Sequence, residues 1–511
     1  MLEKTRKNQE KAFSEALSSH QARVSLEDTG YITSITGPIA WASGLGSVGF
    51  EELVEFEDGT RALVAYLEAH SAGLILLDPS AHIRAGMEVK RLRRVVDIGT
   101  GPDLIGRVFT ASGEVLDNKG PLNTDRRLPI ERPAPAIMDR DPVTSPLETG
   151  IKVIDTLIPV GKGQRELILG DRQTGKTAIG LDTIANQKNK DVICIYVAVG
   201  QRESAMARVI HELEENGAMA YTIILVAGGE KGPGLQYITP YAATSLAESF
   251  MEQGKDVLII YDDLTRHARA YRELSLLLEH PPGREAFPGD IFYIHSRLLE
   301  RSTHLRPELG GGSLTALPII ETEEQNLSAY IPTNLISITD GQIYLSPELF
   351  SKGMLPAIDV GRSVSRVGGK AQRPAFKGLV GELKLSYSQF EELESFSRFA
   401  TRLDEKTRQA LERGRRLREL LRQHRYSPRK DYEQVVTMLA LIRGLFDRVS
   451  LEKTAEAEEE IRRALESEAE EIITSVSGDQ ELTDKQQNRL VELCRRALED
   501  AGLVDSGDQQ D

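Results

Sequence analysis

One run of eight residues has the types and the spacing that bind a phosphate group. Its members are Gly170, Asp171, Arg172, Gln173, Thr174, Gly175, Lys176 and Thr177. In the pattern G-x-x-x-x-G-K-[ST] the glycines let backbone N–H groups curl around a phosphate, and the following helix directs its positive end at the same charge. Lys176 is expected to reach the outer phosphates, and the Thr177 hydroxyl to bind Mg²⁺. Because a short buried strand is expected at 166–169 and a helix at 178–186, the sequence predicts a nucleotide site here.

A second, acidic segment is expected to complete the metal site. The apolar strand at 257–260 leads into Tyr261, Asp262 and Asp263. A strand that ends in aspartate places a carboxylate near the Mg²⁺ of a bound nucleotide. Asp262 is the candidate metal ligand because it is the first acid after the strand, and Asp263 is expected to hold the loop. The alternative is an aspartate that only caps the next turn.

The residue expected to activate water is missing. After the apolar strand at 193–199 the turn reads Gly200, Gln201 and Arg202. A carboxylate at the second of these positions could take up a proton from the attacking water, whereas the amide of Gln201 cannot. Gln201 is therefore expected to help bind the nucleotide without acting as a base. Glu203, two residues further on, is the alternative candidate for the base. The sequence predicts a site that holds ATP and hydrolyses it poorly.

Composition excludes several classes of function. The chain has 511 residues, 40% of them hydrophobic, and a formal net charge of −15. No apolar run reaches the ~18 residues that span a bilayer, and segment 1–25 lacks the apolar core of a signal peptide. The negative charge argues against general nucleic-acid binding, so no nucleic-acid partner is expected. Cys194 and Cys494 are too few for a disulfide framework.

The texture of the sequence changes along the chain and predicts several domains. A polar arm at 1–29 precedes short strands separated by turns at 30–94, which indicate a small β-barrel. Apolar strands alternate with helical stretches at 95–372, which is typical of a parallel α/β sheet. The remainder, 373–511, is expected to be a helical domain, with almost wholly helical texture from about Tyr387 onward.

Four longer motifs identify a family. They are GQRELILGDRQTGKT at 163–177, PPGREAFPGD at 281–290, HSRLLER at 295–301 and PAIDVGRSVSR at 356–366. Together they resemble the alpha subunit of F-type ATP synthases, over roughly 30–448. Two places distinguish this resemblance from the catalytic beta subunit. Beta-type loops are rich in glycine and alanine where this chain has Asp171 to Gln173, and beta carries glutamate where this chain has Gln201.

The resemblance implies a fold and an assembly. It implies an N-terminal β-barrel, a central RecA-like α/β P-loop domain and a C-terminal α-helical bundle. Three alpha subunits would alternate with three beta subunits around a rotating gamma subunit, with peripheral stalk subunits outside. The complex would couple ion translocation to ATP synthesis or hydrolysis at the cytoplasmic face of a bacterial inner membrane. The chain itself would attach to that membrane only indirectly, through the complex.

The resemblance also assigns roles to residues outside the phosphate loop. Alpha's own site binds ATP and Mg²⁺ without catalysis, and Arg366 is lent to the active site of the neighbouring beta subunit as an arginine finger. Ser363 is a second candidate there, through positioning. A structural ion pair at the subunit interface is the alternative for Arg366. From the helical domain, Gln423 and Arg425 are expected over the adenine, unless both are simply exposed loop residues.

The chain departs from the family pattern in three places, one of which is Arg362, where the family often has an apolar residue. Family members usually have Gln-Pro-Gln over the purine, whereas this chain has Gln423, His424 and Arg425. The N-terminal arm, which meets the delta subunit of the stalk in relatives, matches poorly. The poor match of the arm suggests an alternate, second ATP synthase of a bacterium, without an ordinary delta subunit.

Three other functions are alternatives to the alpha subunit. A self-sufficient export-type ATPase would need a carboxylate where Gln201 stands. A Rho-like hexameric translocase would need a basic, aromatic RNA channel, whereas aromatic residues make up 5% of this acidic chain. A purely structural ring subunit with a dead pocket would bind no nucleotide.

Overall fold

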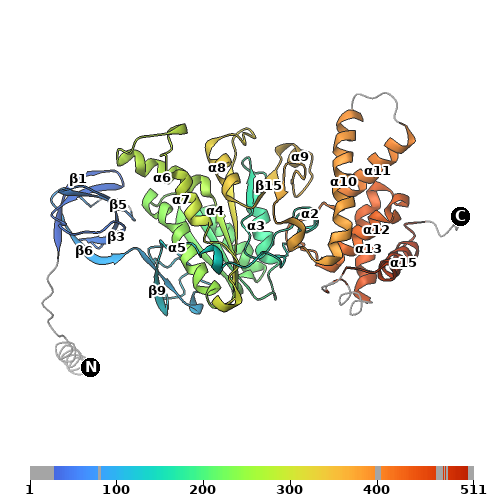
Figure 1. Cartoon of the computed structure of the whole chain (residues 1–511), viewed down its shortest axis with the longest axis horizontal. Helices are drawn as coiled ribbons and strands as arrows, with labels where there is room; N and C mark the ends of the chain where they lie inside the picture. The colour runs from blue at the N-terminus through green and yellow to red at the C-terminus, as the bar shows by residue number, and fades with distance from the viewer. Residues whose placement is uncertain are drawn as a thin grey trace, which may run out of the picture. The chain divides into compact units, whose positions relative to one another are not determined.

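The computed structural model describes residues 28–78, 82–397, 404–467, 476, 478 and 481–504 (Figure 1). Nearly all of the expected N-terminal arm at 1–29 lies outside the described residues. The chain forms two compact units: the first ends at Val95, and the second contains the chain from Val96 onward together with the short segment Leu77–Pro79.

Six antiparallel strands close the first unit into a barrel, in the order β1-β2-β5-β4-β3-β6. They are β1 (Thr29–Thr36), β2 (Ile39–Ser43), β3 (Glu52–Phe56), β4 (Arg61–Leu67), β5 (Ser71–Leu76) and β6 (Glu88–Val95). Small and branched side chains such as Ala40, Val54 and Leu74 fill the interior. Arg91 of β6 donates to both carboxylate oxygens of Glu52 in β3, at 2.9 and 2.8 Å. The predicted N-terminal β-barrel is confirmed.

A sheet in the order β16-β15-β10-β14-β13-β11-β12-β8 forms the centre of the second unit. Its strands are β8 (Val108–Phe109), β10 (Leu167–Gly170), β11 (Val192–Gln201), β12 (Thr222–Gly228), β13 (Asp256–Asp262), β14 (Ser313–Glu321), β15 (Gly341–Leu345) and β16 (Val364–Ser365). Neighbouring strands are parallel except at the β15–β16 edge. The inner strands are mostly apolar because a parallel sheet is buried on both faces.

Helices alternate with these strands, as the sequence predicted (Figure 1). They are α2 (Lys152–Leu157), α3 (Lys176–Ala185), α4 (Glu203–Glu215), α5 (Pro233–Met251), α6 (Leu264–Leu277), α7 (Ile291–Leu299), α8 (Tyr330–Ile338) and α9 (Pro347–Ser351). A separate antiparallel pair is formed by β7 (Asp97–Thr100) and β9 (Arg126–Pro129). Helix α5 is buried along nearly its whole length, which places it in the core of this domain.

The C-terminal part of the second unit is helical. Its helices are α10 (Pro374–Ser397), α11 (Glu405–Leu420), α12 (Asp431–Ile442), α13 (Thr454–Ser467) and α15 (Asp484–Asp500). Thr483 and Gln486 form a capping box at the start of α15. The predicted helical domain is confirmed, although its first helix begins well before Tyr387. Among the described helices, none combines the length and the apolar character that crossing a bilayer requires.

Candidate nucleotide site

The phosphate loop connects β10 to α3 at the carboxyl end of the central sheet. Gly175 directly precedes α3 with φ of +100°, a conformation that favours glycine. A Cβ at Gly170 would come within 2.7 Å of the Leu345 carbonyl oxygen, so close backbone approach requires glycine there too. The ammonium of Lys176 donates to the carbonyl oxygens of Gly170 and Asp171 at 2.8 and 2.7 Å. The lysine is thus held at the rim of the loop, within reach of a phosphate seated on it.

The outer side chains of the loop contact the protein itself. The Asp171 carboxylate accepts a hydrogen bond from the Thr322 hydroxyl at 2.6 Å. Arg172 forms an ion pair of 3.1 Å with Glu321, although its own side chain is mostly exposed. These contacts attach the loop to the end of β14. The two other polar residues of the loop are the positive-φ Gln173 and the buried Thr174.

Three side chains, one from α3 and two from β11, converge on the buried carboxylate of Asp262. The Thr177 hydroxyl donates to its Oδ2 at 2.7 Å, and the Tyr196 hydroxyl donates to the same atom at 2.6 Å. The Gln201 amide donates to its Oδ1 at 3.1 Å. Burial and the charge of Asp262 raise the pKa of Tyr196 well above its usual range, so this hydroxyl stays a donor. The structure therefore brings Thr177, Gln201 and Asp262 together.

The oxygen atoms of Thr177 and Asp262 fit a magnesium ion. Mg²⁺ prefers oxygen ligands and is commonly held by one or two carboxylates together with substrate phosphates. The structure places a hydroxyl and a carboxylate 2.7 Å apart beside the phosphate loop, which is this donor set. Within the described residues, no cluster of three or more His, Cys, Asp or Glu side chains forms an all-protein metal site. A metal here would depend on the phosphates of a nucleotide for its other ligands.

Asp263 holds the loop, as the sequence predicted. Its side chain accepts a hydrogen bond from the Arg266 backbone at 2.8 Å and so caps α6. Burial, together with the negative charge of Asp262, raises the pKa of Asp263 to about 7. The alternative base Glu203 is exposed at the first residue of α4.

Both the oxygen and the nitrogen of the Gln423 side-chain amide form hydrogen bonds with main-chain atoms. Its oxygen accepts from the Lys152 backbone at 2.9 Å, and its nitrogen donates to the carbonyl oxygens of Gly150 and Ser427 at 2.7 and 2.8 Å. The side chain therefore joins the loop that follows α11 to the start of α2.

Arg425 forms an ion pair with Glu212 of α4 at 2.8 Å and stacks 4.9 Å from the ring of Tyr426. Tyr426 donates its hydroxyl to the same Glu212 at 2.7 Å, and its backbone N–H donates to Asp182 of α3 at 3.1 Å. Burial raises the pKa of Asp182 to about 6. The segment expected to cover the purine is thus attached to the helix that begins at the phosphate loop.

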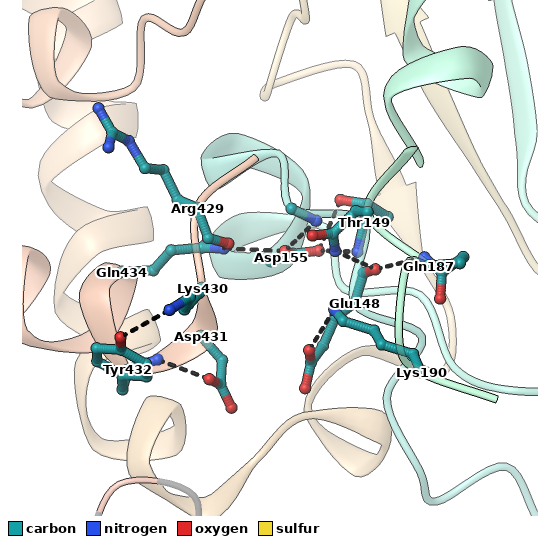
Figure 2. Close-up of polar contacts among 12 residues, drawn as sticks. Glu148, Thr149, Asp155, Gln187, Lys190, Arg429, Lys430, Asp431, Tyr432 and Gln434 are labelled. Carbon is teal, nitrogen blue, oxygen red and sulfur yellow. Dashed lines mark hydrogen bonds and ion pairs between the residues drawn. The ribbon is translucent and has the colours of Figure 1, made fainter. Parts of the chain in front are cut away.

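The far end of α3 is attached to a polar network (Figure 2). The Glu148 carbonyl oxygen accepts from the Gln187 side chain at 2.9 Å, and the Glu148 carboxylate pairs with Lys190 at 2.6 Å. Asp155 of α2 accepts from the Gln434 side chain of α12 at 3.0 Å. Burial raises the pKa of Asp155, whereas for Glu148 the positive charges beside it outweigh burial and lower the pKa. The network ties α3 to the helical domain.

Sequence reasoning missed Tyr196, Glu148 and Asp155. Tyr196 lies inside an apolar strand and resembles a core residue. Nothing in the local pattern marks Glu148 or Asp155, because their partners come from distant segments. Only the order of the strands, in which β11 pairs with β13, could have placed Tyr196 near Asp262.

Arg366 lies outside this site, at the other end of the sheet. Its exposed guanidinium donates to the carbonyl oxygens of Thr339 and Ile336, at 3.2 and 3.4 Å, beside the C-terminus of α8. Ser365 pairs with Gly341, the first residue of β15, whereas the phosphate loop follows the last residues of β10. Four residues along β15, or roughly 13 Å, separate the end that pairs with Ser365 from the end beside the phosphate loop. Arg366 is therefore distant from the phosphate loop of its own chain.

Ser363 fixes the backbone that leads to Arg366. Its hydroxyl donates to the Asp359 carbonyl oxygen at 2.5 Å and accepts from the Tyr344 N–H at 3.0 Å. The side chain is 8% exposed, so it holds a turn rather than facing a ligand.

Models of one protein family match all three parts of the chain. Residues 26–93 match the beta-barrel domain of the ATP synthase alpha/beta family, and residues 150–365 match its nucleotide-binding domain. Residues 372–497 match the C-terminal domain of the ATP synthase alpha/beta chain. The chain belongs to the ATP synthase alpha/beta family. The match to the nucleotide-binding domain of this family contains the phosphate loop, Gln201 and Asp262.

Relatives within the ATP synthase alpha/beta family carry alpha-subunit names. The ATP synthase subunit alpha 1 of Marinomonas sp. (strain MWYL1) is 58% identical over 95% of both chains. The subunit alpha 2 of Nitrosospira multiformis is 58% identical over 94% of both chains. The subunit alpha 1 of Chlorobium luteolum is 55% identical over 96% of both. The resemblance to an alpha subunit is confirmed.

Proposed function

We propose that the chain acts as the alpha subunit in an F-type ATP synthase head and that its own site binds Mg-ATP without turning it over. The position of Gln201 carries this proposal, because its amide donates to Asp262 at 3.1 Å where hydrolysis would require a base. An amide cannot take up the proton of an attacking water. Lys176, Thr177 and Asp262 supply the phosphate and metal contacts that binding needs.

Binding and hydrolysis by the purified chain test this proposal. We expect saturable binding of Mg-ATP in a calorimetric titration, with phosphate release far below the ~1 s⁻¹ that is common for enzymes. Lys176→Ala is the control and should abolish binding, because it removes the ammonium that meets the phosphates. Steady hydrolysis at ~1 s⁻¹ or more would contradict a non-catalytic site. Absence of binding would favour a structural subunit with a dead pocket.

In this proposal Arg366 serves the active site of an adjacent beta subunit. A guanidinium is always charged and planar, so it can stabilise charge that spreads over the γ-phosphoryl oxygens. Two observations support this role: the guanidinium is exposed, and it lies at the end of the sheet opposite to its own phosphate loop. Ser363 contributes by fixing the turn that precedes it.

Gln423 and Arg425 are proposed to lie over the adenine. The contact of their loop with Asp182 of α3 supports this placement, since α3 begins at the phosphate loop. Gln423 would offer the remaining acceptor site of its amide oxygen to the purine, because both N–H groups already donate to Gly150 and Ser427. Arg425 would form the side of the pocket next to α4.

The assembly in which the chain works is proposed from its relatives. It contains beta and gamma subunits and a peripheral stalk, and it lies at the cytoplasmic face of a bacterial membrane, where it couples ion transport to ATP chemistry. The numbered names alpha 1 and alpha 2 of the relatives support a second ATP synthase. The same relatives disfavour an export-type ATPase or a Rho-like translocase. The domain bounds 1–29, 30–94, 95–372 and 373–511 stay predictions.

A further inference from the structure

A buried carboxyl group that the nucleotide site does not use lies at the start of β10. Glu166 is fully buried, and its Oε2 accepts a hydrogen bond from the Gln164 amide at 2.6 Å. Its other oxygen, Oε1, has no hydrogen-bond partner within the described part of the chain. A buried carboxyl oxygen without a hydrogen bond lowers the free energy of unfolding, and such groups are often retained because they serve a function.

Gln164 connects this carboxyl group to the segment that carries Arg366. The Gln164 amide nitrogen donates to Glu166 and also to the Ser365 hydroxyl, at 3.2 Å. Its amide oxygen accepts from the Gly161 N–H at 2.8 Å, which fixes the orientation of the side chain. Ser365 directly precedes Arg366 in the chain. The amide of Gln164 is therefore a bridge between β10 and the base of the arginine side chain.

A second contact reinforces this bridge. Arg165 forms two side-chain hydrogen bonds of 2.9 Å with the carboxylate of Asp340, and the Asp340 carbonyl oxygen accepts from the Arg366 N–H at 2.8 Å. A Cβ at Gly341 would lie 2.6 Å from a Glu166 oxygen, so glycine lets the carboxyl group approach this backbone closely. Gln164 thus contacts the arginine segment directly, whereas Arg165 reaches it through Asp340 and Glu166 through Gln164.

Arg366 also acts electrostatically on the buried carboxyl group of Glu166. Burial raises the pKa of Glu166 well above its usual range, and the positive charge of Arg366 acts in the opposite direction. The positive charge of Arg366 thus opposes the effect of burial on this carboxyl group.

We propose that Gln164 and Glu166 are positioning residues that aim Arg366 at the nucleotide of the neighbouring subunit. Glu166 holds the Gln164 amide, the amide holds Ser365, and Ser365 sets where the arginine side chain begins. This inference rests on the proposed role of Arg366 in trans. Positioning matters because a displacement of about 1 Å at a catalytic group can lower a rate by roughly 10²-fold.

The test uses the complete complex with beta and gamma subunits and compares Glu166→Ala, Glu166→Gln and Arg366→Ala. Glu166→Ala removes the acceptor of the Gln164 amide, so we expect multisite turnover to fall by about tenfold or more. Glu166→Gln keeps an acceptor oxygen and the size of the side chain, so it should restore turnover. KM, assembly and ATP affinity at the chain's own site should not change, because that site lies at the other end of β10.

The double variant Glu166→Ala with Arg366→Ala separates a positioning role from a general structural role. If Glu166 acts through Arg366, its substitution should cause no further loss of the residual turnover in the Arg366→Ala background. An equal loss in both backgrounds, or near-normal turnover of Glu166→Ala alone, would overturn the inference. If Glu166→Ala fails to assemble, Ser365→Ala cuts the same bridge from its other end, and normal turnover of that variant would overturn it. Normal turnover of Arg366→Ala would instead contradict the proposed function.

Discussion

At the scale of single residues, the nucleotide site depends on one carboxylate. Asp262 accepts hydrogen bonds from a threonine that begins a helix, a tyrosine inside a strand and a glutamine at the end of that strand. The tyrosine and the glutamine hold the carboxylate in place. The threonine, which lies next to the phosphate loop, donates to the same carboxylate. The amide of Gln201 thus orients the proposed metal ligand, and no group on it can accept a proton from water.

Thr177→Ala should weaken binding of Mg-ATP by roughly ten- to a hundredfold, because it removes a proposed magnesium ligand. Binding of ATP in the presence of a chelator should change little. Titration of the purified chain with and without Mg²⁺ measures both quantities. Thr177→Ser keeps the hydroxyl and is the matched control. Equal losses with and without Mg²⁺ would assign the threonine to the phosphate instead.

Gln423→Ala should weaken ATP binding and leave assembly intact, because the amide is proposed to contact the adenine. The same amide also joins Gly150, Lys152 and Ser427, so a general loosening of the loop must be distinguished from a lost purine contact. Inorganic tripolyphosphate, which has no purine, serves as the control ligand. Unchanged ATP affinity, or an equal loss for both ligands, would contradict the purine assignment.

At the scale of elements, α3 connects the nucleotide to the helical domain. Its first residue contacts the phosphate loop, Asp182 in its middle holds Tyr426, and the residues after its end meet Glu148. Glu148 also pairs with Arg373, which directly precedes α10, at 2.6 Å. A helix that is held at both ends and in its middle cannot shift easily relative to the segments that hold it. The helical domain should therefore keep its position relative to the nucleotide.

Glu148→Gln should lower the free energy of unfolding by about 3 kcal/mol at neutral pH, because it removes the carboxylate that pairs with Lys190 and one of the two carboxylates that pair with Arg373, which keeps Asp431. The pKa of Glu148 is lowered in the folded state, so its contribution is full above the ordinary carboxyl pKa of about 4.3 and is lost as the pH falls through the lowered value. Denaturant titrations between pH 7 and pH 3 measure this difference.

Glu215→Gln is the control for this prediction. Glu215 forms an exposed pair with His211, so its substitution should change stability by about 0.5 kcal/mol or less. A loss for Glu148→Gln as small as that of the control, or a loss that grows below pH 4, would contradict the role of the network.

At the scale of the whole molecule, the sequence predicted the parts of the chain better than their contacts. The β-barrel, the parallel sheet and the helical domain follow from local periodicity and turn residues, and the phosphate loop, Gln201 and Asp262 each follow an apolar strand. The contacts of Tyr196 and Glu166 depend on which strands become neighbours, and local patterns do not determine strand order. Helix α10 begins at Pro374, earlier than the sequence pattern indicated. The glycines at 378 and 381 have low helix propensity, and they therefore hid the first turns of this helix from the sequence pattern.

Replacement of Arg366 in the assembled complex with beta and gamma subunits tests the central claim most directly. The account predicts that Arg366→Ala lowers multisite ATP turnover by roughly 10³-fold or more, while nucleotide binding and assembly are preserved. Arg366→Lys should restore little of this turnover, because a lysine keeps the charge but loses the planar fork of donors. Near-normal turnover of both variants in a fully assembled complex would contradict the account.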